Sequence, residues 1–274
     1  MRQRDDAVLT GALHTVQPLL FTVEFRRKMA ELSQRDRQDW LSSLASRLRR
    51  DPSPALLQEL REVARGCRLP LMDAIQRQLG PFEPLHLSAI LEVPRERFVR
   101  AQDVERSAED VPLPLDDEGL STISAPHAYL LSFRLLALEP GDSLIELGTG
   151  SGYGAALSAF IVGSAGRVAT FEIDETLVRW AQRTLSDQPC VEGHHGDAVT
   201  SAPQWGGAAK VVVTFAVEAL PEPWLAGLPE GGRLVAPVGG RDRDQRLVLV
   251  QREDGAIVES DHGAVRYVKN RSRR

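Results

Sequence analysis

The stretch LIELGTGSGYGAAL, residues 144–157, decides the fold that we expect for this chain of 274 residues. A hydrophobic run that contains one acid, Glu146, leads into glycines at positions 148, 150 and 152, and an alanine-rich segment follows. Glycine lets the backbone turn tightly off a strand and approach a ligand without a Cβ in the way. The N–H groups that begin the next helix then point at the same ligand. The stretch therefore predicts a strand, a ligand-binding turn and a helix.

Further apolar runs rich in β-branched residues recur after Pro84, most of them separated by helix-length intervals. They cover residues 143–147, 167–173, 210–216, 233–239 and 245–253. Strands that alternate with helices predict a mostly parallel sheet with helices on both faces. The last two runs follow each other closely, which predicts an antiparallel finish. We therefore expect a doubly wound, Rossmann-like α/β domain whose ligand lies at the carboxyl ends of the strands.

Residues 1–87 have a different texture and are expected to form a helical extension before the main domain of residues 88–274. Apolar residues on helical spacing predict helix between residues 22 and 50. Ser53 and Pro54 read as the N-cap and first residue of a second helix, with Gly66 as its stop. A third helix is expected around residues 71–79, ended by Gly80. The extension is interpreted as a unit for substrate recognition or dimerisation.

Composition and charge narrow the classes of function. The chain is 42% hydrophobic and 26% charged, which suits one substantial domain with a smaller accessory region. Residues 101–274 carry 16 basic against 25 acidic side chains, which argues against a nucleic-acid partner. No apolar stretch is long enough to span a bilayer, and two acids interrupt the N-terminal segment where a signal peptide would have its apolar core. A cytoplasmic protein without a membrane partner is expected.

The remaining reactive side chains favour ordinary structural roles. Cys67 and Cys190 lie far apart and are expected to be reduced thiols. The neighbours His194 and His195 would point to opposite faces of a strand and have no third ligand at a suitable interval, so no metal site is expected. The basic tail KNRSRR (269–274) reads as a solvated terminus.

Three acids indicate what the glycine turn holds. Tyr153 stands where a dinucleotide fingerprint would require glycine, which disfavours a Rossmann dehydrogenase, and Glu146 would repel phosphate but suit an ammonium group. Glu172 ends the next strand, at the place that faces ribose hydroxyls in this topology. Asp197, in HHGDA, precedes the following helix and can reach an adenine amino group. Ammonium, ribose and adenine together indicate S-adenosylmethionine as cofactor, and hence a class I methyltransferase.

Several longer motifs accompany these acids. They are VPRERFV (93–99), LSTISAPHAYLL (120–131), PGDSLIELGTGSGYGAAL (140–157), GDA (196–198), LPEPWLAGLPEGGRLVAPVG (220–239), Gln245 and VRYV (265–268). With these motifs, the chain resembles the protein-L-isoaspartate (D-aspartate) O-methyltransferase family over roughly residues 88–268. The block TISAPH (122–127) is the most specific feature, because few methyltransferases outside this family place such a block about twenty residues before the glycine turn.

The resemblance implies roles for individual residues. Ser124 would lie beside the reacting carboxylate as a hydrogen-bonding positioner. Cofactor contacts are implied for Thr122, Ile123, Glu146, Gly148, Thr149, Gly150, Ser151, Gly152, Glu172, Ile173, Asp197, Ala198 and Gln245. Substrate contacts are expected from Ser124, His127, Thr214, Phe215, Ala216 and Glu218.

The activity implied by the resemblance is methyl transfer to an aspartyl or isoaspartyl carboxylate in a peptide or protein. The methyl ester would then collapse to a succinimide. A carboxylate with an ordinary pKa of about 4 is already ionised at neutral pH, so no general base is required. Three features depart from the family pattern: the N-terminal extension, Ala198 in place of glycine, and the loop 214–218 with its bulky Phe215 and acidic Glu218.

These departures leave several functions open. An added recognition surface and an altered substrate loop favour a family member dedicated to one ribosomal peptide, such as a lanthipeptide, lasso peptide or graspetide precursor. General repair of L-isoaspartyl proteins is the alternative. A methyltransferase for small molecules is disfavoured because TISAPH belongs to a peptide-accommodating cleft, and a non-catalytic cofactor-binding protein is disfavoured by the intact acids and glycines.

Overall fold

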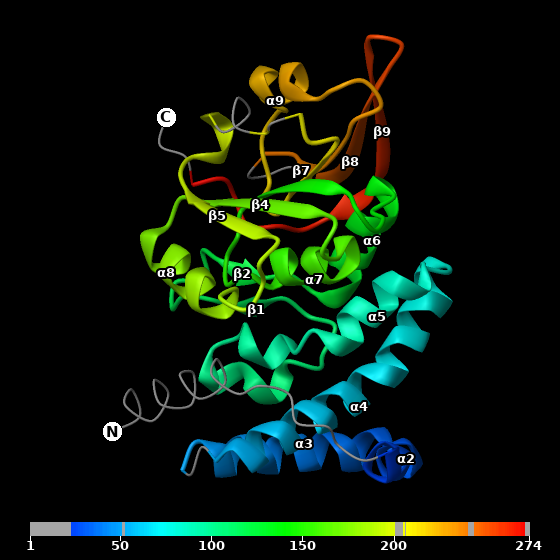
Figure 1. Ribbon diagram of the computed structural model, residues 1–274, viewed down its shortest axis with the longest axis vertical. Helices are drawn as coiled ribbons and strands as arrows, with labels where there is room; N and C mark the ends of the chain where they lie inside the picture. Colours follow the sequence, from blue (N-terminus) through cyan, green and yellow to red (C-terminus); the bar gives the residue numbers. More distant parts are fainter. Residues whose placement is uncertain (1–22, 51–52, 201–204, 206, 241–243, 272–274) are drawn as a thin grey trace.

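A seven-stranded sheet forms the centre of the molecule (Figure 1). The computed structural model describes residues 23–50, 53–200, 205, 207–240 and 244–271. The strands are β3 (Ser143–Leu147), β4 (Arg167–Glu172), β5 (Val191–His195), β6 (Lys210–Val213), β7 (Arg233–Val238), β8 (Gln245–Glu253) and β9 (Ala256–Val265). They lie in the order β5-β4-β3-β6-β7-β8-β9, so β5 and β9 are the two edges.

The direction of the strands confirms the predicted doubly wound fold with an antiparallel finish. Strands β5 to β7 pair in parallel, while β8 and β9 pair antiparallel. The strands predicted over 143–147 and 245–253 have the expected bounds, whereas β6 ends at Val213, earlier than predicted. Strands β5 and β9 are not among the predicted runs, because most of their residues are exposed or only partly buried and they carry no continuous apolar pattern.

Successive side chains of the buried strands point to opposite faces of the sheet and belong to two hydrophobic clusters, one on each face. In β3, Leu144 belongs to the first cluster, and Ile145 and Leu147 belong to the second. The first cluster packs against α5 (Pro84–Glu92), α6 (Pro126–Leu136), α7 (Tyr153–Val162) and α8 (Glu175–Thr184). The second packs against α9 (Glu222–Gly227) and the short helix η3 (Ala198–Thr200). Helices therefore cover both faces, as predicted.

The N-terminal part consists of α2 (Val23–Glu31), α3 (Gln34–Leu48) and α4 (Pro54–Leu79). The predicted start at Ser53 is confirmed, because its side chain accepts a hydrogen bond from the backbone N–H of Leu56 at 3.3 Å. Gly80 ends α4 with a φ of 84°, as predicted.

The predicted stop at Gly66 is wrong, since α4 runs through Gly66 and Pro70 as one helix of 26 residues. Pro70 has no N–H to give to the carbonyl of Gly66, four residues earlier. Arg37 of α3 supplies the missing donor, because its Nη1 lies 2.7 Å from that carbonyl oxygen. Gly66 lets the end of the Met29 side chain approach α4 closely, since a Cβ there would lie 2.8 Å from the Cε of Met29. A contact between helices therefore continues a helix that local sequence would end.

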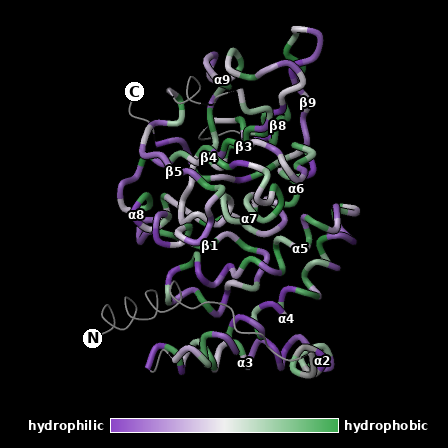
Figure 2. Tube along the Cα trace, viewed as in Figure 1, coloured by the Kyte–Doolittle hydropathy of each residue, from purple (hydrophilic) through white to green (hydrophobic). Residues whose placement is uncertain are grey.

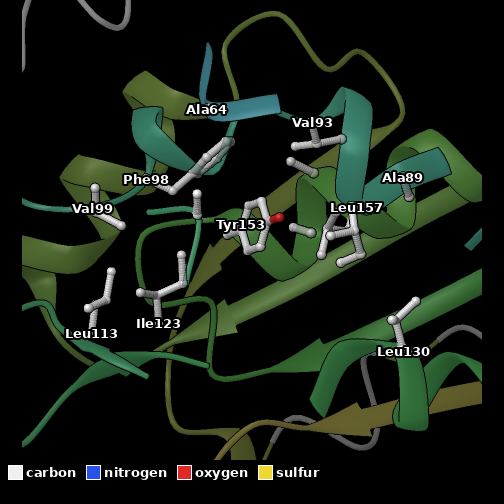
Figure 3. Packing of buried hydrophobic residues seen from close by; sticks show 14 of the residues in the cluster. Ala64, Ala89, Val93, Phe98, Val99, Leu113, Ile123, Leu130, Tyr153 and Leu157 are labelled. Carbon is white, nitrogen blue, oxygen red and sulfur yellow. The ribbon is translucent and has the colours of Figure 1, made fainter. Parts of the chain in front are cut away.

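The N-terminal helices share one hydrophobic core with the sheet. The first cluster runs without interruption from Leu41 and Leu44 in α3, through Ala64 in α4, to Tyr153 and Leu157 in α7. Figure 3 shows Ala64, Phe98 and Tyr153 converging in this region, and Figure 2 shows hydrophobic residues recurring along α3, α4, α5 and α7.

A short segment between α5 and α6 covers one side of the strand ends. It contains the helices η1 (Arg95–Arg97) and η2 (Ala101–Arg106) and the antiparallel pair β1 (Leu113–Pro114) and β2 (Thr122–Ile123). TISAPH therefore begins with β2 and ends in the first turn of α6. Among the described residues, no helix has both the length and the apolar character needed to cross a membrane.

Candidate active site

The glycine turn joins β3 to α7 at the carboxyl ends of the parallel strands. The backbone N–H groups of Gly148 and Thr149 donate to the carbonyl of Phe171 in β4, at 2.8 and 3.1 Å. Gly148 has a φ of 98°, and a Cβ there would lie 2.3 Å from the hydroxyl of Thr214. Both the backbone conformation and the close approach therefore require glycine at this position.

Glu146 is a buried carboxylate beneath this turn, with an exposed fraction of 1%. Its register partner in β4 is Thr170, whose hydroxyl donates to Oε2 at 2.7 Å. Burial raises the pKa of Glu146 to about 8, the negative charge of Glu172 adds to the rise, and the Thr170 hydrogen bond opposes it. A carboxylate in such surroundings suits a cationic ligand group, which would stabilise its charged form.

Glu172 ends β4 on the other side of the turn. Its Oε2 accepts a hydrogen bond from the N–H of Gly150 at 2.8 Å, and its Oε1 accepts from the N–H groups of Ile173 and Asp174, both at 3.0 Å. Burial nevertheless raises the pKa of Glu172 above its usual range. Asp197 follows β5, and its Oδ1 accepts from the N–H of Val199 at 2.9 Å.

A pocket at the strand ends brings these groups together and contains about 550 Å³ of empty space. We call it the strand-end pocket. Its lining comes from residues 120–122, 171–173, 196–198, 214–215 and 268–271, with Gly148, Gly150 and Leu177. A second, inner pocket lies beside it, lined by residues 122–124 and 148–151 with Leu115, Tyr129, Glu146, Tyr153 and Thr214.

A larger groove, with about 1750 Å³ of empty space, opens beside TISAPH. We call it the α4–β9 groove, because Ile75, Gln78 and Leu79 of α4 face residues 264–267 at the end of β9 across it. Thr122 and Ser124 line both this groove and the inner pocket. Ser124 therefore stands where a molecule in the groove would meet a molecule in the two pockets.

Most of the residues assigned to the cofactor line the two pockets. Gln245 does not: its amide is used by the backbone of Tyr267, which donates N–H to Oε1 at 2.6 Å and accepts from Nε2 at 3.1 Å. Gly152 also lines neither pocket and is instead the N-cap residue of α7. The residues that line them are Thr122, Ile123, Glu146, Gly148, Thr149, Gly150, Ser151, Glu172, Ile173, Asp197 and Ala198.

The residues assigned to the substrate are divided between different places. Ser124 and His127 line the α4–β9 groove, and Asp110 orients His127 through Oδ2, which lies 2.9 Å from Nδ1. Thr214 and Phe215 line the strand-end pocket instead. Ala216 is buried and pairs through its backbone with Val268 and Asn270, while Glu218 is exposed outside the lining of both pockets and the groove.

Arg95 is a site residue that sequence reasoning missed. Its guanidinium is fully buried and donates to the carbonyl oxygens of Ser107, Glu109, Val111 and Ser124 at 2.7 to 3.2 Å. VPRERFV (93–99) looks like a charged surface segment, and no local pattern shows that one of its arginines is surrounded by carbonyls. Arg95 thus fixes the backbone of Ser124.

The prediction of a merely solvated basic tail is wrong for its first three residues. Lys269, Asn270 and Arg271 line the strand-end pocket, and residues 272–274 lie outside the described residues. The two adjacent histidines belong to edge strand β5, where His194 stacks on Phe171 with ring centroids 4.7 Å apart. No cluster of three potential metal ligands occurs within the described ranges.

The sheet, the glycine turn and the acids at successive strand ends define a class I S-adenosylmethionine-dependent methyltransferase. The buried Glu146 carboxylate and the cradle around Gly148 fit that cofactor, since they offer a negative charge and close backbone approach without a phosphate site. A sequence model of the family described as protein-L-isoaspartate(D-aspartate) O-methyltransferase matches residues 72–274. The chain belongs to this family and is an S-adenosylmethionine-dependent carboxyl methyltransferase.

Individual relatives agree with this assignment. The chain is 37% identical over 200 residues to the protein-L-isoaspartate O-methyltransferase of Gloeobacter violaceus, covering 72% of this chain and 95% of that one. It is 40% identical over 188 residues to the enzyme of the same name from Halorhodospira halophila, covering 67% and 82%. A solved protein-L-isoaspartate O-methyltransferase superposes with a TM-score of 0.67 at 27% identity, covering 74% of this chain and 65% of that one.

Proposed function

We propose that this enzyme methylates the free carboxylate of L-isoaspartyl residues in peptides and proteins, as in protein repair. The position of Ser124 carries the proposal, because it lines both the α4–β9 groove and the inner pocket. An isoaspartyl peptide in the groove would present its carboxylate at Ser124. When bound, S-adenosylmethionine supplies the methyl group from the other side.

We assign the cofactor contacts by the chemistry of each group. Glu146 would pair with the α-ammonium group, Glu172 would accept hydrogen bonds from ribose hydroxyls, and Asp197 would accept from the adenine amino group. Each of these carboxylates, or the loop that carries it, lines one of the two adjoining pockets. Since the three lie at the ends of successive elements, their spacing can match the length of one extended ligand.

Ser124 is suited to position a carboxylate without acting as a nucleophile. Its backbone is fixed at both ends, because its carbonyl accepts from Arg95 at 3.1 Å and its N–H donates to the hydroxyl of Tyr129 at 3.3 Å. A carboxylate is already ionised at neutral pH, so the remaining task is to align oxygen, methyl carbon and sulfur. A hydroxyl on a preorganised backbone can contribute that alignment.

The repair function is favoured over modification of a dedicated ribosomal peptide, which the sequence alone favours. The named relatives are all called protein-L-isoaspartate O-methyltransferase. Phe215 and Glu218, the two residues that suggest a dedicated peptide substrate, lie away from the groove. Phe215 lines the strand-end pocket, and Glu218 lines neither that pocket nor the groove. The N-terminal helices, which suggest an added recognition surface, pack into the common core, and the α4 residues that line the groove lie within residues 72–274, the part that matches the family model.

A matched pair of short peptides tests the proposal. One contains isoaspartate and the other contains ordinary aspartate in the same sequence, and mass spectrometry measures the methyl ester. We expect methylation of the isoaspartyl peptide alone. Methylation of the aspartyl peptide would overturn the repair proposal. Methylation of neither peptide by an enzyme that still binds S-adenosylhomocysteine would also overturn it.

A substitution at Ser124 tests the proposed role of that residue. Loss of a hydrogen bond to a charged group costs about 1.5–3 kcal/mol, so Ser124→Ala should lower kcat about tenfold to a hundredfold. Cofactor affinity should stay close to that of the parent enzyme. Ser186→Ala is a suitable control and should leave kcat unchanged, because the exposed Ser186 hydroxyl donates to the carbonyl of Arg183 and lines neither pocket nor the groove.

A further inference from the structure

Residues that follow β9 contribute to the lining of the strand-end pocket. Val268–Arg271 line this pocket together with residues 120–122. We call Val268–Arg271 the strap. Its backbone is anchored to the loop after β6, where the N–H of Ala216 donates to the carbonyl of Val268 at 2.7 Å and the N–H of Asn270 donates to the carbonyl of Ala216 at 3.0 Å.

Arg271 links the strap to two other segments of the chain. Its Nη1 donates to Oδ2 of Asp174 at 2.9 Å, and its Nη2 donates to Oδ2 of Asp116 at 3.1 Å. Asp174 lies just after β4, and Asp116 begins the loop that leads to residues 120–122. One planar guanidinium therefore connects three segments that each contribute lining residues to the same pocket, a geometry that arginine provides and lysine does not.

Both partners of Arg271 are tied to parts of the cofactor site. The N–H of Asp174 donates to the carboxylate of Glu172 at 3.0 Å, so this ion pair contacts the turn that holds the ribose-side acid. Oδ1 of Asp116 accepts from the N–H of Leu120 at 2.9 Å, which fixes the start of the lining segment 120–122. Breaking the two Arg271 ion pairs would release both the strap and the loop between Asp116 and Leu120.

We propose that Arg271, through Asp116 and Asp174, closes the strand-end pocket over the cofactor and slows the release of S-adenosylhomocysteine. Arg271 acts as a positioning residue for cofactor retention. The inference requires only that the family's cofactor occupies this pocket, and its test uses no peptide, so a failure of the repair proposal would leave the result interpretable.

The test measures the dissociation rate of S-adenosylhomocysteine by stopped-flow displacement and its Kd by calorimetry. The ion pairs are partly exposed, with Arg271 at 29%, Asp116 at 23% and Asp174 at 32%, so a moderate effect is expected. Arg271→Gln should speed dissociation about threefold to twentyfold. Asp116→Asn should also speed dissociation, while its remaining side-chain oxygen can still accept from the N–H of Leu120. The increase in dissociation rate in the double variant should be smaller than the product of the two single increases.

A second readout follows the cofactor-free protein by hydrogen exchange. Arg271→Gln should speed exchange of the amides in residues 115–122, which a general loss of stability would not single out. Arg65→Gln is the matched control, because it removes an ion pair with Glu92 of similar exposure that lines neither pocket. Equal dissociation rates in Arg271→Gln, Arg65→Gln and the parent enzyme would overturn the proposal.

Discussion

Glu146 combines a buried position with a pKa raised to about 8, and this combination has a measurable consequence. In the cofactor-free protein near pH 6.5, a carboxyl group with this pKa is mostly protonated. An ammonium group placed beside it stabilises the ionised form and lowers that pKa. Binding of the cofactor should therefore release a proton at pH values between the lowered pKa of the bound state and about 8, and this release should fade as the pH rises through 8.

Calorimetry at pH 6.5 in buffers with different ionisation enthalpies measures this proton exchange directly. We expect release of about one proton per S-adenosylhomocysteine bound by the parent enzyme. Glu146→Gln should bind more weakly and release almost none, since its amide does not titrate. Proton uptake by the parent enzyme, or undiminished release by Glu146→Gln, would show that another group carries the linkage.

Gly154 faces the same carboxylate from the first turn of α7. A Cβ at this position would lie 1.9 Å from Oε1 of Glu146 and 3.0 Å from Cε1 of Tyr129. Alanine is normally the better helix residue by about 0.5–1 kcal/mol, but the buried acid has little room to move. Overpacking of this kind costs about 1–3 kcal/mol, so the clash should decide the sign.

We therefore expect Gly154→Ala to lower the free energy of unfolding in urea and to weaken cofactor binding. Gly193→Ala in β5 is the control, because a Cβ there would have no neighbour within 4 Å. If Gly154→Ala proved as stable as Gly193→Ala and bound cofactor normally, the packing around Glu146 would be looser than described.

At the scale of elements, α4 shows how a contact between helices overrides a local stop signal. Arg37 donates Nη1 to the Gly66 carbonyl that Pro70 leaves without its helical partner, and it also donates Nε and Nη2 to the carbonyl of Leu32 at the end of α2. The same side chain thus supports the end of one helix and the middle of another. Buried or partly buried hydrogen bonds from a charged donor contribute about 1.5–3 kcal/mol each.

A double-mutant cycle isolates the bond to Gly66. Pro70→Ala restores a backbone N–H that can serve this carbonyl, so Arg37→Ala should cost less free energy of unfolding in the Pro70→Ala background than in the parent. We expect a coupling of about 0.5–1.5 kcal/mol, measured from urea unfolding curves. Strictly additive effects would show that the carbonyl does not depend on Arg37.

The sequence predicts well those elements whose pattern is local. β3 and the glycine turn are predictable because an apolar run and three glycines stand next to each other, and Glu146 and Glu172 follow from the rule that ligands lie at the carboxyl ends of parallel strands. Arg95 and Arg271 cannot be found in this way, because their partners lie between 12 and 155 residues away. Their roles arise only when the chain folds.

At the scale of the whole molecule, the continuous core implies that the N-terminal helices and the sheet unfold together. Cys67 offers a probe, since it is buried in α4 with an exposed fraction of 5%, and the chain has only one other cysteine. In a Cys190→Ser variant, labelling of Cys67 by a thiol reagent requires the helices to open.

We expect the free energy of opening obtained from Cys67 labelling to equal the global free energy of unfolding from urea curves within about 1 kcal/mol. The Cys67→Ser variant serves as the control, because the partly exposed Cys190 should react without global unfolding. An opening free energy for Cys67 several kcal/mol below the global value would mean that the N-terminal helices detach on their own.

The two edges of the sheet bear on how this enzyme behaves in concentrated mixtures. An uncovered edge strand offers unpaired N–H and C=O groups to any extended chain, including the damaged chains that we propose as substrates. β5 carries Glu192, which pairs with Arg167, and β9 carries Glu259 and Asp261. Desolvating such charges opposes the addition of a foreign strand. We therefore expect the polar residues of β5 and β9, which also leave these strands without a continuous hydrophobic pattern, to oppose aggregation of the enzyme with partly unfolded proteins.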